Sequence, residues 1–171
     1  MHPTGNLEKY RPRLKIISGG QTGADRGGLD AAIALGIPHG GYCPRRRKAE
    51  DGRIPDRYQL SELASASYLT RTEKNVKESD CTLLFTVGPP TGGSKRTIDF
   101  ANKHRKPIFM FDLAEAIEES ADSFKNWFTL MLKSEKDIIV INVAGSRESK
   151  SHGIATTTEH SICKIILNLV N

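Results

Sequence analysis

Residues 14–36 read LKIISGGQTGADRGGLDAAIALG, in which an apolar run and a helical pattern flank a cluster of glycines. The apolar run, 14–18, stops at two glycines, and from Asp25 onward apolar residues recur at helical spacing until Gly36. A glycine directly after a periodic stretch is a common helix end, because its backbone tolerates the left-handed conformation. This stretch therefore predicts a strand, a glycine-rich loop and a helix.

The same unit recurs in the middle of the chain. Residues 81–87 form a continuous apolar and β-branched run, which is typical of a strand buried on both faces of a parallel sheet, and we expect it at the centre. A helix-compatible stretch, 72–78, precedes this run, and a second glycine loop and another helical stretch follow it. Further runs at 107–111 and 138–144, with a short segment at 37–42, complete a sheet of roughly five strands.

Alternating strands and helices with strands of the buried type predict right-handed β-α-β units. We therefore expect the α/β class: a single Rossmann-like domain, with a mostly parallel sheet and helices on both faces. A last amphipathic stripe, 162–170, follows Thr156 and Glu159, which have capping-box spacing. We assign residues 14–171 to this ligand-binding domain and residues 1–13, which contain proline and glycine without periodicity, to a flexible N-terminal arm.

Composition limits the classes of protein that the chain can represent. The 171 residues include 37% hydrophobic and 26% charged residues, as in a globular protein rather than a disordered one. No stretch approaches the roughly 18 apolar residues of a membrane span, so we expect a cytoplasmic protein without a membrane partner. Three separated cysteines without a CxxC pair and five histidines without HExxH spacing predict neither a disulfide framework nor a metal site.

Positive charge is concentrated in the first third of the chain. The formal net charge is +5, and residues 1–57 hold 11 Lys and Arg against 6 Asp and Glu, while the rest holds 14 of each. A polar segment, 44–60, has the character of a loop and contains four consecutive cations that suit an anion clamp, a nucleic-acid contact or a solvated surface. Because only Tyr42 and Tyr58 lie nearby for base stacking, we expect a small ligand rather than nucleic acid. The candidate clamp comprises Arg45, Arg46, Arg47 and Lys48.

An open α/β sheet binds its ligand beyond the carboxyl ends of the strands, where helix N-termini favour anions. Two glycine loops, 18–28 and 91–97, occupy equivalent positions there, and together they predict a ligand site. Neither loop contains GxGxxG or the GK[ST] of a P-loop. A third loop, 145–150, would close over the ligand or form a solvated turn. The candidate phosphate-binding residues are Gly19, Gly20, Gln21, Thr22, Gly23, Arg26, Arg71, Gly92, Gly93, Ser94 and Thr97.

Several strings also carry a resemblance to a known family. They are IISGGQTGADRGGLDAAIALGIPHGGYCP at 16–44, RKAEDGRIPDRY at 47–58, RTEKNVKESDCTLLFTVG at 71–88, TGGSKRT at 91–97 and NVAGSRESKSHGI at 142–154. Over about residues 15–167 the chain resembles the putative molybdenum carrier proteins. These are a branch of the Rossmann-like superfamily that includes the lonely-guy phosphoribohydrolases and DNA-processing protein A.

The resemblance implies a pocket for a phosphorylated, nucleotide-like ligand at the two glycine loops, in a homo-oligomer. It also implies molybdenum cofactor as a ligand, held through the phosphate of its molybdopterin, although no residue here recognises a pterin or molybdenum specifically. The second loop of the phosphoribohydrolases reads PGGxGTxxE and ends on a catalytic glutamate, whereas Phe100 stands at that place in this chain.

We therefore favour a binding or carrier protein over an enzyme. The first alternative is a hydrolase that cleaves an N-glycosidic or phosphate-ester bond of a nucleotide-derived substrate, in which Glu73 or Asp99 would replace the missing glutamate. The second alternative is a nucleic-acid-binding module that uses the basic loop.

Overall fold

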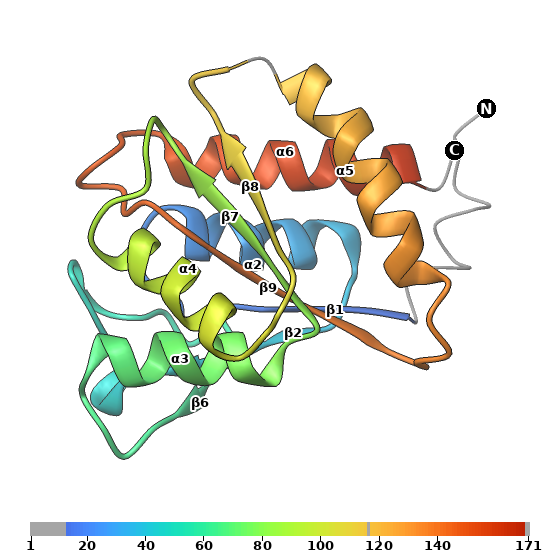
Figure 1. The fold of residues 1–171 in the computed structure, drawn as a ribbon. Coiled ribbons are helices and arrows are strands. Elements are labelled where there is room, and N and C mark those ends of the chain that lie inside the picture. Colours follow the sequence, from blue (N-terminus) through green and yellow to red (C-terminus); the bar gives the residue numbers. More distant parts are fainter. Residues whose placement is uncertain (1–12, 116, 170–171) are drawn as a thin grey trace.

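The structure is a computed structural model that describes residues 13–115 and 117–169 (Figure 1). Within these ranges, the main sheet has five parallel strands in the order β2-β1-β9-β7-β8. Their bounds are β1 Leu14–Ile17, β2 His39–Gly40, β7 Cys81–Thr86, β8 Ile108–Asp112 and β9 Ile139–Gly145. The predicted α/β class and parallel sheet are confirmed. The predicted N-terminal arm lies, except for its last residue, outside the described residues.

The middle of the sheet belongs to β9 and not, as predicted, to the run at 81–87. On one side β9 pairs with β1, where Ile141 lies opposite Ile16, and on the other it pairs with β7, where Val143 lies opposite Leu83. An apolar run is typical of any strand that has neighbours on both sides, so it does not distinguish the second position from the third.

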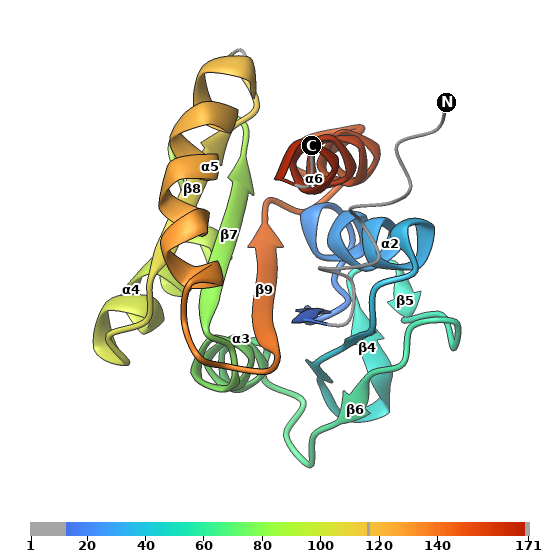
Figure 2. The same ribbon diagram turned by 90° about the vertical axis from the view of Figure 1, so that its right-hand side faces the viewer.

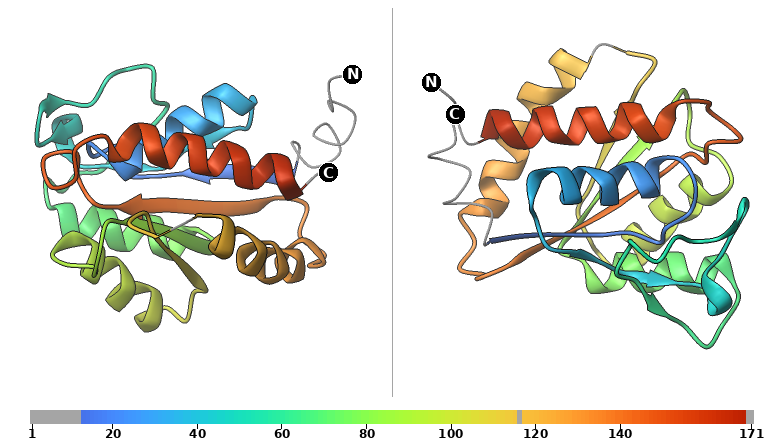
Figure 3. Two further views of the ribbon diagram at one scale, coloured as in Figure 1. Left: turned by 90° about the horizontal axis from the view of Figure 1, so that it is seen from above. Right: turned by 180° about the vertical axis from the view of Figure 1, so that it is seen from behind.

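Helices cover both faces of the sheet, as predicted (Figures 2 and 3). On one face α2 and α6 pack against each other, and α5 joins them over β8; on the other face α3 packs against α4. The helices are α2 Ala24–Leu35, α3 Tyr68–Glu78, α4 Gly93–Lys103, α5 Ile117–Leu132 and α6 Ile154–Leu169. In the described ranges, none of them combines the length and apolar content needed to cross a membrane.

The predicted capping box of the last helix is wrong by one turn. α6 begins at Ile154, upstream of Thr156, because the carboxylate of Glu148 accepts the backbone N–H groups of Gly153 and of Ala155, the latter at 3.1 Å. A carboxylate at this position satisfies free N–H groups and complements the helix dipole.

The two faces of the sheet differ in polarity. Strand residues such as Ile139 and Ile141 point toward α2, α5 and α6, where they form one apolar core with Phe124 and Phe128. Burial of this kind supplies most of the stability of a domain, at about 25 cal/mol per Å². The alternate strand residues point toward α3 and α4 and include buried polar side chains, among them Thr82, Thr86 and Asn142.

The basic segment between β2 and α3 has its own small core. It contains a short 3-10 turn at Arg45–Arg47 and two pairs of short strands, β3 (Tyr42–Cys43) with β6 (Ser61–Glu62), and β4 (Lys48–Ala49) with β5 (Gly52–Arg53). Their apolar side chains form a second cluster with a leucine of α2; the cluster comprises Leu29, Cys43, Ala49, Ile54 and Tyr58. The stretch predicted as a loop is therefore a packed subdomain.

Candidate functional site

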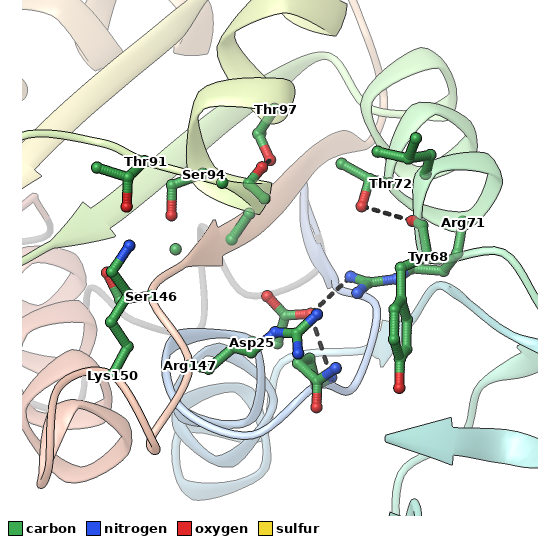
Figure 4. Close-up of a pocket in the computed structure, with 16 residues that line it drawn as sticks. Asp25, Tyr68, Arg71, Thr72, Thr91, Ser94, Thr97, Ser146, Arg147 and Lys150 are labelled. Atoms are coloured by element: carbon green, nitrogen blue, oxygen red, sulfur yellow. Dashed lines mark hydrogen bonds and ion pairs between the residues drawn. The ribbon is translucent and has the colours of Figure 1, made fainter. Parts of the chain in front are cut away.

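The candidate site lies where the connections leave the sheet in opposite directions. From β1 the chain passes to α2 on one face, from β7 it passes to α4 on the other, and β9 ends between them at Gly145. In open α/β sheets such a switch point leaves a crevice beyond the strand ends. A pocket of about 300 Å³ occupies this place and is lined by the start of α2, the first turn of α3, the start of α4 and the loop after β9 (Figure 4).

The N-terminus of α4 forms one wall of this pocket. Gly92 has φ +53° and ψ −122°, a conformation that favours glycine, and it leads the chain into the helix. A Cβ added to Gly92 or Gly93 would meet no other heavy atom within 4 Å. The N–H of Ser94 donates to Thr91 at 3.1 Å, but no acceptor in the described part of the chain takes the N–H groups of Gly93 and Lys95. This helix end is therefore open to an anion.

Arg71 and Asp25 form a buried ion pair beside the pocket. Arg71 reaches from α3 and its Nη1 donates to Oδ2 of Asp25 at 2.8 Å, with both side chains more than nine-tenths buried (Figure 4). The guanidinium lies against Gly19, where a Cβ would be only 1.8 Å from Nη1. Burial raises the pKa of Asp25, although the charge of Arg71 opposes this shift.

Two buried side-chain donors next to this ion pair lack hydrogen-bond acceptors among the described residues. They are Nε of Arg71 and the side-chain nitrogen of Gln21. A buried donor without an acceptor costs about 1–3 kcal/mol. The surroundings of the ion pair therefore contain more buried donors than buried acceptors.

The loop after β9 brings two more cations to the pocket. Lys150 reaches toward the start of α4, and the guanidinium carbon of Arg147 lies 4.9 Å from the ring centroid of Tyr68 (Figure 4). Together with Arg71, three cations therefore line the pocket, and Asp25 is the one carboxylate among the described residues of its lining. The charge of the walls suits an anionic ligand.

Glu50, outside this pocket, holds the loop after β9 in place. Its carboxylate accepts the hydroxyl of Ser149 at 2.6 Å, the N–H of Ser149 at 3.3 Å and the hydroxyl of Thr22, and it lies 3.7 Å from the guanidinium of Arg147. Burial by itself would raise the pKa of Glu50, but these hydrogen bonds outweigh it and lower that pKa. Glu50 therefore anchors the loop as a carboxylate at neutral pH.

The structure divides the predicted phosphate-binding residues into two sets. Those that line the pocket are Gln21, Arg71, Gly92, Gly93, Ser94 and Thr97. Those outside its lining are Gly19, Gly20, Thr22, Gly23 and Arg26. The first glycine loop thus contributes to the pocket through Gln21 and the neighbouring Asp25, whereas most of the second loop lines it.

Packing against neighbouring segments explains most of the glycines and the arginine of the first loop. Gly23 has φ +83°, and a Cβ there would lie 2.3 Å from the carbonyl oxygen of Ser146 in the loop after β9. The guanidinium of Arg26 makes two hydrogen bonds to Asp51, at 2.6 and 2.7 Å, and a third to the carbonyl of Gly20 at 3.1 Å. The first loop thus packs against the loop after β9 at Gly23 and against the turn between β4 and β5 at Arg26.

The predicted anion clamp lies at a different place. Arg45, Arg46 and Lys48 line a second hollow of about 310 Å³ together with Arg53, whereas Arg47 is buried.

The candidate carboxylates also lie outside the pocket. Oε1 of Glu73 is 2.7 Å from Nζ of Lys103 and 2.8 Å from Nε2 of His104, and these contacts lower the pKa of Glu73. Asp99 lies 3.6 Å from the guanidinium of Arg96 on the exposed side of α4. Within 13–115 and 117–169, no group of three or more His, Cys, Asp or Glu side chains could hold a metal ion.

Sequence reasoning missed several residues of this pocket, among them two cations and an aromatic ring. The stretch 145–150 was singled out as a loop that could cover a ligand, but its residues Arg147 and Lys150 were not named as ligand-binding. Tyr68 carries no local signal at all, because its place depends on how the first turn of α3 packs.

Known proteins similar to this chain share its fold and much of its sequence. The sequence matches the circularly permutated YpsA SLOG family, cpYpsA, over residues 16–166. It is 42% identical to a putative molybdenum carrier protein from Syntrophus aciditrophicus SB, whose crystal structure superposes with a TM-score of 0.81 over 93% of this chain and 95% of that chain. No curated protein matches the sequence. The resemblance predicted from the motifs is thereby confirmed, and the chain belongs to the circularly permutated YpsA SLOG family.

Proposed function

We propose that this protein binds a phosphorylated, nucleotide-like small molecule in the pocket at the switch point. The open N-terminus of α4 is the observation that carries the proposal. A phosphate there would accept hydrogen bonds from the N–H groups of Gly93 and Lys95 and from the hydroxyl of Ser94. Among the described residues, neither of these N–H groups has an acceptor. Arg147 and Lys150 would neutralise its charge from the opposite side.

The name of the similar protein supports a carrier role, in which molybdenum cofactor is one ligand. A volume of about 300 Å³ is at the lower end for small-molecule sites, and it accommodates a phosphate with part of the attached group. Neither cysteine nor histidine is among the described residues that line the pocket. These residues would therefore hold the phosphate of the cofactor and not its metal. The homo-oligomeric state and the cytoplasmic location expected from the sequence remain predictions.

The geometry favours binding over hydrolysis. Glu73 and Asp99, the carboxylates available to the hydrolase alternative, lie outside the pocket and pair with cations of α4 or its end. Asp25 is the carboxylate that lines the pocket, and its Oδ2 is already occupied by Arg71 and by the N–H of Gln21 at 3.2 Å.

Gly93→Leu tests the proposal. The leucine would occupy open space at a position that lines the pocket, so we expect a melting temperature within about 2 °C of the wild type and an affinity at least about tenfold weaker. The probe is whichever compound of a nucleotide, sugar phosphate and molybdopterin panel raises the melting temperature most, with affinity then measured by calorimetry. Asn102→Leu, on an exposed part of the same helix, serves as the control. Unchanged affinity in Gly93→Leu would overturn the placement.

A further inference from the structure

The second hollow, at the basic run, is not used by the proposed function. Its cations are Arg45, Arg46, Lys48 and Arg53, and all four are exposed. Cations on a solvated loop are mobile unless contacts with the rest of the chain hold the backbone that carries them.

The side chain of Arg47 holds the backbone of this run in place. Its side chain is buried, and its guanidinium donates to four carbonyl oxygens at 2.8–3.3 Å, those of Ile54, Pro55, Tyr58 and Leu60. Arg46 and Arg47 have φ +62° and +51°, in the left-handed region that residues other than glycine rarely adopt. Such strain persists only where the surrounding contacts impose it, and it concentrates at ligand sites. The backbone of the run is therefore held in place, and the cations other than Arg47 are exposed on it.

The hollow also carries positive charge that the protein does not neutralise. In the described ranges, no acceptor takes a side-chain N–H of Arg45 or Arg46 and neither forms an ion pair. Arg53 pairs with Asp56 at 2.8 Å. Glu62 accepts the backbone N–H of Arg46. The described residues that line the hollow thus include four cations and no carboxylate.

The hollow adjoins the pocket at a single aromatic ring. Nζ of Lys48, which lines the hollow, lies 5.2 Å from the ring centroid of Tyr68. Arg147, which lines the pocket, lies 4.9 Å from the same centroid. Tyr68 therefore lies between a cation of the pocket and a cation of the hollow.

We propose that the basic hollow is a second phosphate subsite, so that the ligand carries two phosphates separated by its body. One phosphate lies at the start of α4, and the other lies among Arg45, Arg46 and Lys48. This inference rests on the proposed function and narrows its ligand class to compounds such as nucleoside bisphosphates and dinucleotides. Arg47 acts as a positioning residue for the second subsite and does not contact the phosphate itself.

Titration of the 15N-labelled full chain with inorganic phosphate, at constant ionic strength against chloride, tests the subsite directly. We expect two separate sets of amide signals to shift, one at 92–97 and one at 45–53. The variant Arg45→Ala/Arg46→Ala/Lys48→Ala should lose the second set and keep the first, and Gly93→Leu should do the reverse. The control Lys77→Ala/Lys125→Ala/Lys133→Ala, which removes three exposed cations elsewhere, should keep both sets.

A spanning probe tests the ligand class. The 5′-phosphorylated dinucleotide of adenosine should bind the wild type about tenfold more tightly than adenosine monophosphate, because the second contact is intramolecular. The triple variant at 45, 46 and 48 should remove this advantage and leave the affinity for the monophosphate within about twofold.

The outcomes separate this inference from the proposed function. Shifts confined to 92–97, or equally large shifts around Lys125 and Lys133, would overturn the second subsite and leave the proposed function intact. Shifts confined to 45–53 would overturn the proposed function. If the affinity continues to rise with each nucleotide added beyond the dinucleotide, the ligand is single-stranded nucleic acid and not a bisphosphate. This result would overturn the proposed ligand class.

Discussion

The two glycine loops resemble each other in sequence and differ in what surrounds them. In the first loop and the helix turn that follows, an added Cβ would lie within 2.6 Å of another heavy atom at every glycine, from 1.8 Å at Gly19 to 2.6 Å at Gly20. In the second loop, Gly92 and Gly93 have nothing within 4 Å. Glycine thus lets the protein approach its own backbone in the first loop, and it leaves the backbone open to a ligand in the second.

Gly23→Ala should disrupt the packing of the first loop and cause the largest loss of stability among the variants proposed here. Alanine at φ +83° and ψ −134° is strained, and its Cβ would collide with the carbonyl oxygen of Ser146. We expect the free energy of unfolding in urea to fall by about 4 kcal/mol or more. Gly93→Ala, the matched change in the second loop, should alter it by less than about 1 kcal/mol. Similar losses in the two variants would contradict the comparison.

Glu50→Gln should have an intermediate effect, because it weakens the link between the first loop and the loop after β9. We expect a loss of about 1–2 kcal/mol at pH 7, since the hydrogen bonds from Ser149 and Thr22 lose a charged acceptor. The affinity for phosphate should also fall, because Arg147 and Lys150 lose their anchor.

The pH dependence of this difference follows from the lowered pKa of Glu50. The ionised carboxylate stabilises the fold fully above its ordinary pKa of 4.5, and this contribution is lost as the pH falls through the lower pKa of the folded state. The difference between wild type and Glu50→Gln, measured by urea unfolding at a series of pH values, should be constant near neutrality and shrink below pH 4.5. A difference that grows on acidification would refute the role given to Glu50.

Two further variants, one in each loop, have the smallest expected effects. They should show that the first loop affects stability and the second affects phosphate binding. Arg26→Met removes a two-point ion pair with Asp51, so unfolding should become easier by about 1 kcal/mol while phosphate affinity stays the same. Ser94→Ala should change stability by less than about 0.5 kcal/mol and weaken phosphate binding about fivefold. Urea unfolding and phosphate calorimetry of both variants check this; weaker binding in Arg26→Met would place the phosphate at the first loop.

Local signals account for what the sequence could predict. The apolar runs and the glycine-to-helix transitions depend on neighbouring residues, so the strands, the helices and the wall formed by Gly93 and Ser94 were predictable. The place of β9 was not, because pairing between residues 60 or more positions apart leaves no periodic trace. The run 45–48 shows the same limit, since three adjacent arginines are chemically identical in the sequence and the fold buries only Arg47.

The position of β9 has a consequence for biosynthesis. It separates β1 from β7, yet it is the last of the five strands to leave the ribosome. Until residues 139–145 emerge, both neighbouring strands keep an unpaired edge, which is the type of surface that chaperones protect in nascent chains. The loop that supplies Arg147 and Lys150 emerges later still. Translation must therefore pass residue 150 before the pocket can exist, and a nascent chain arrested before residue 139 would have neither the complete sheet nor the pocket.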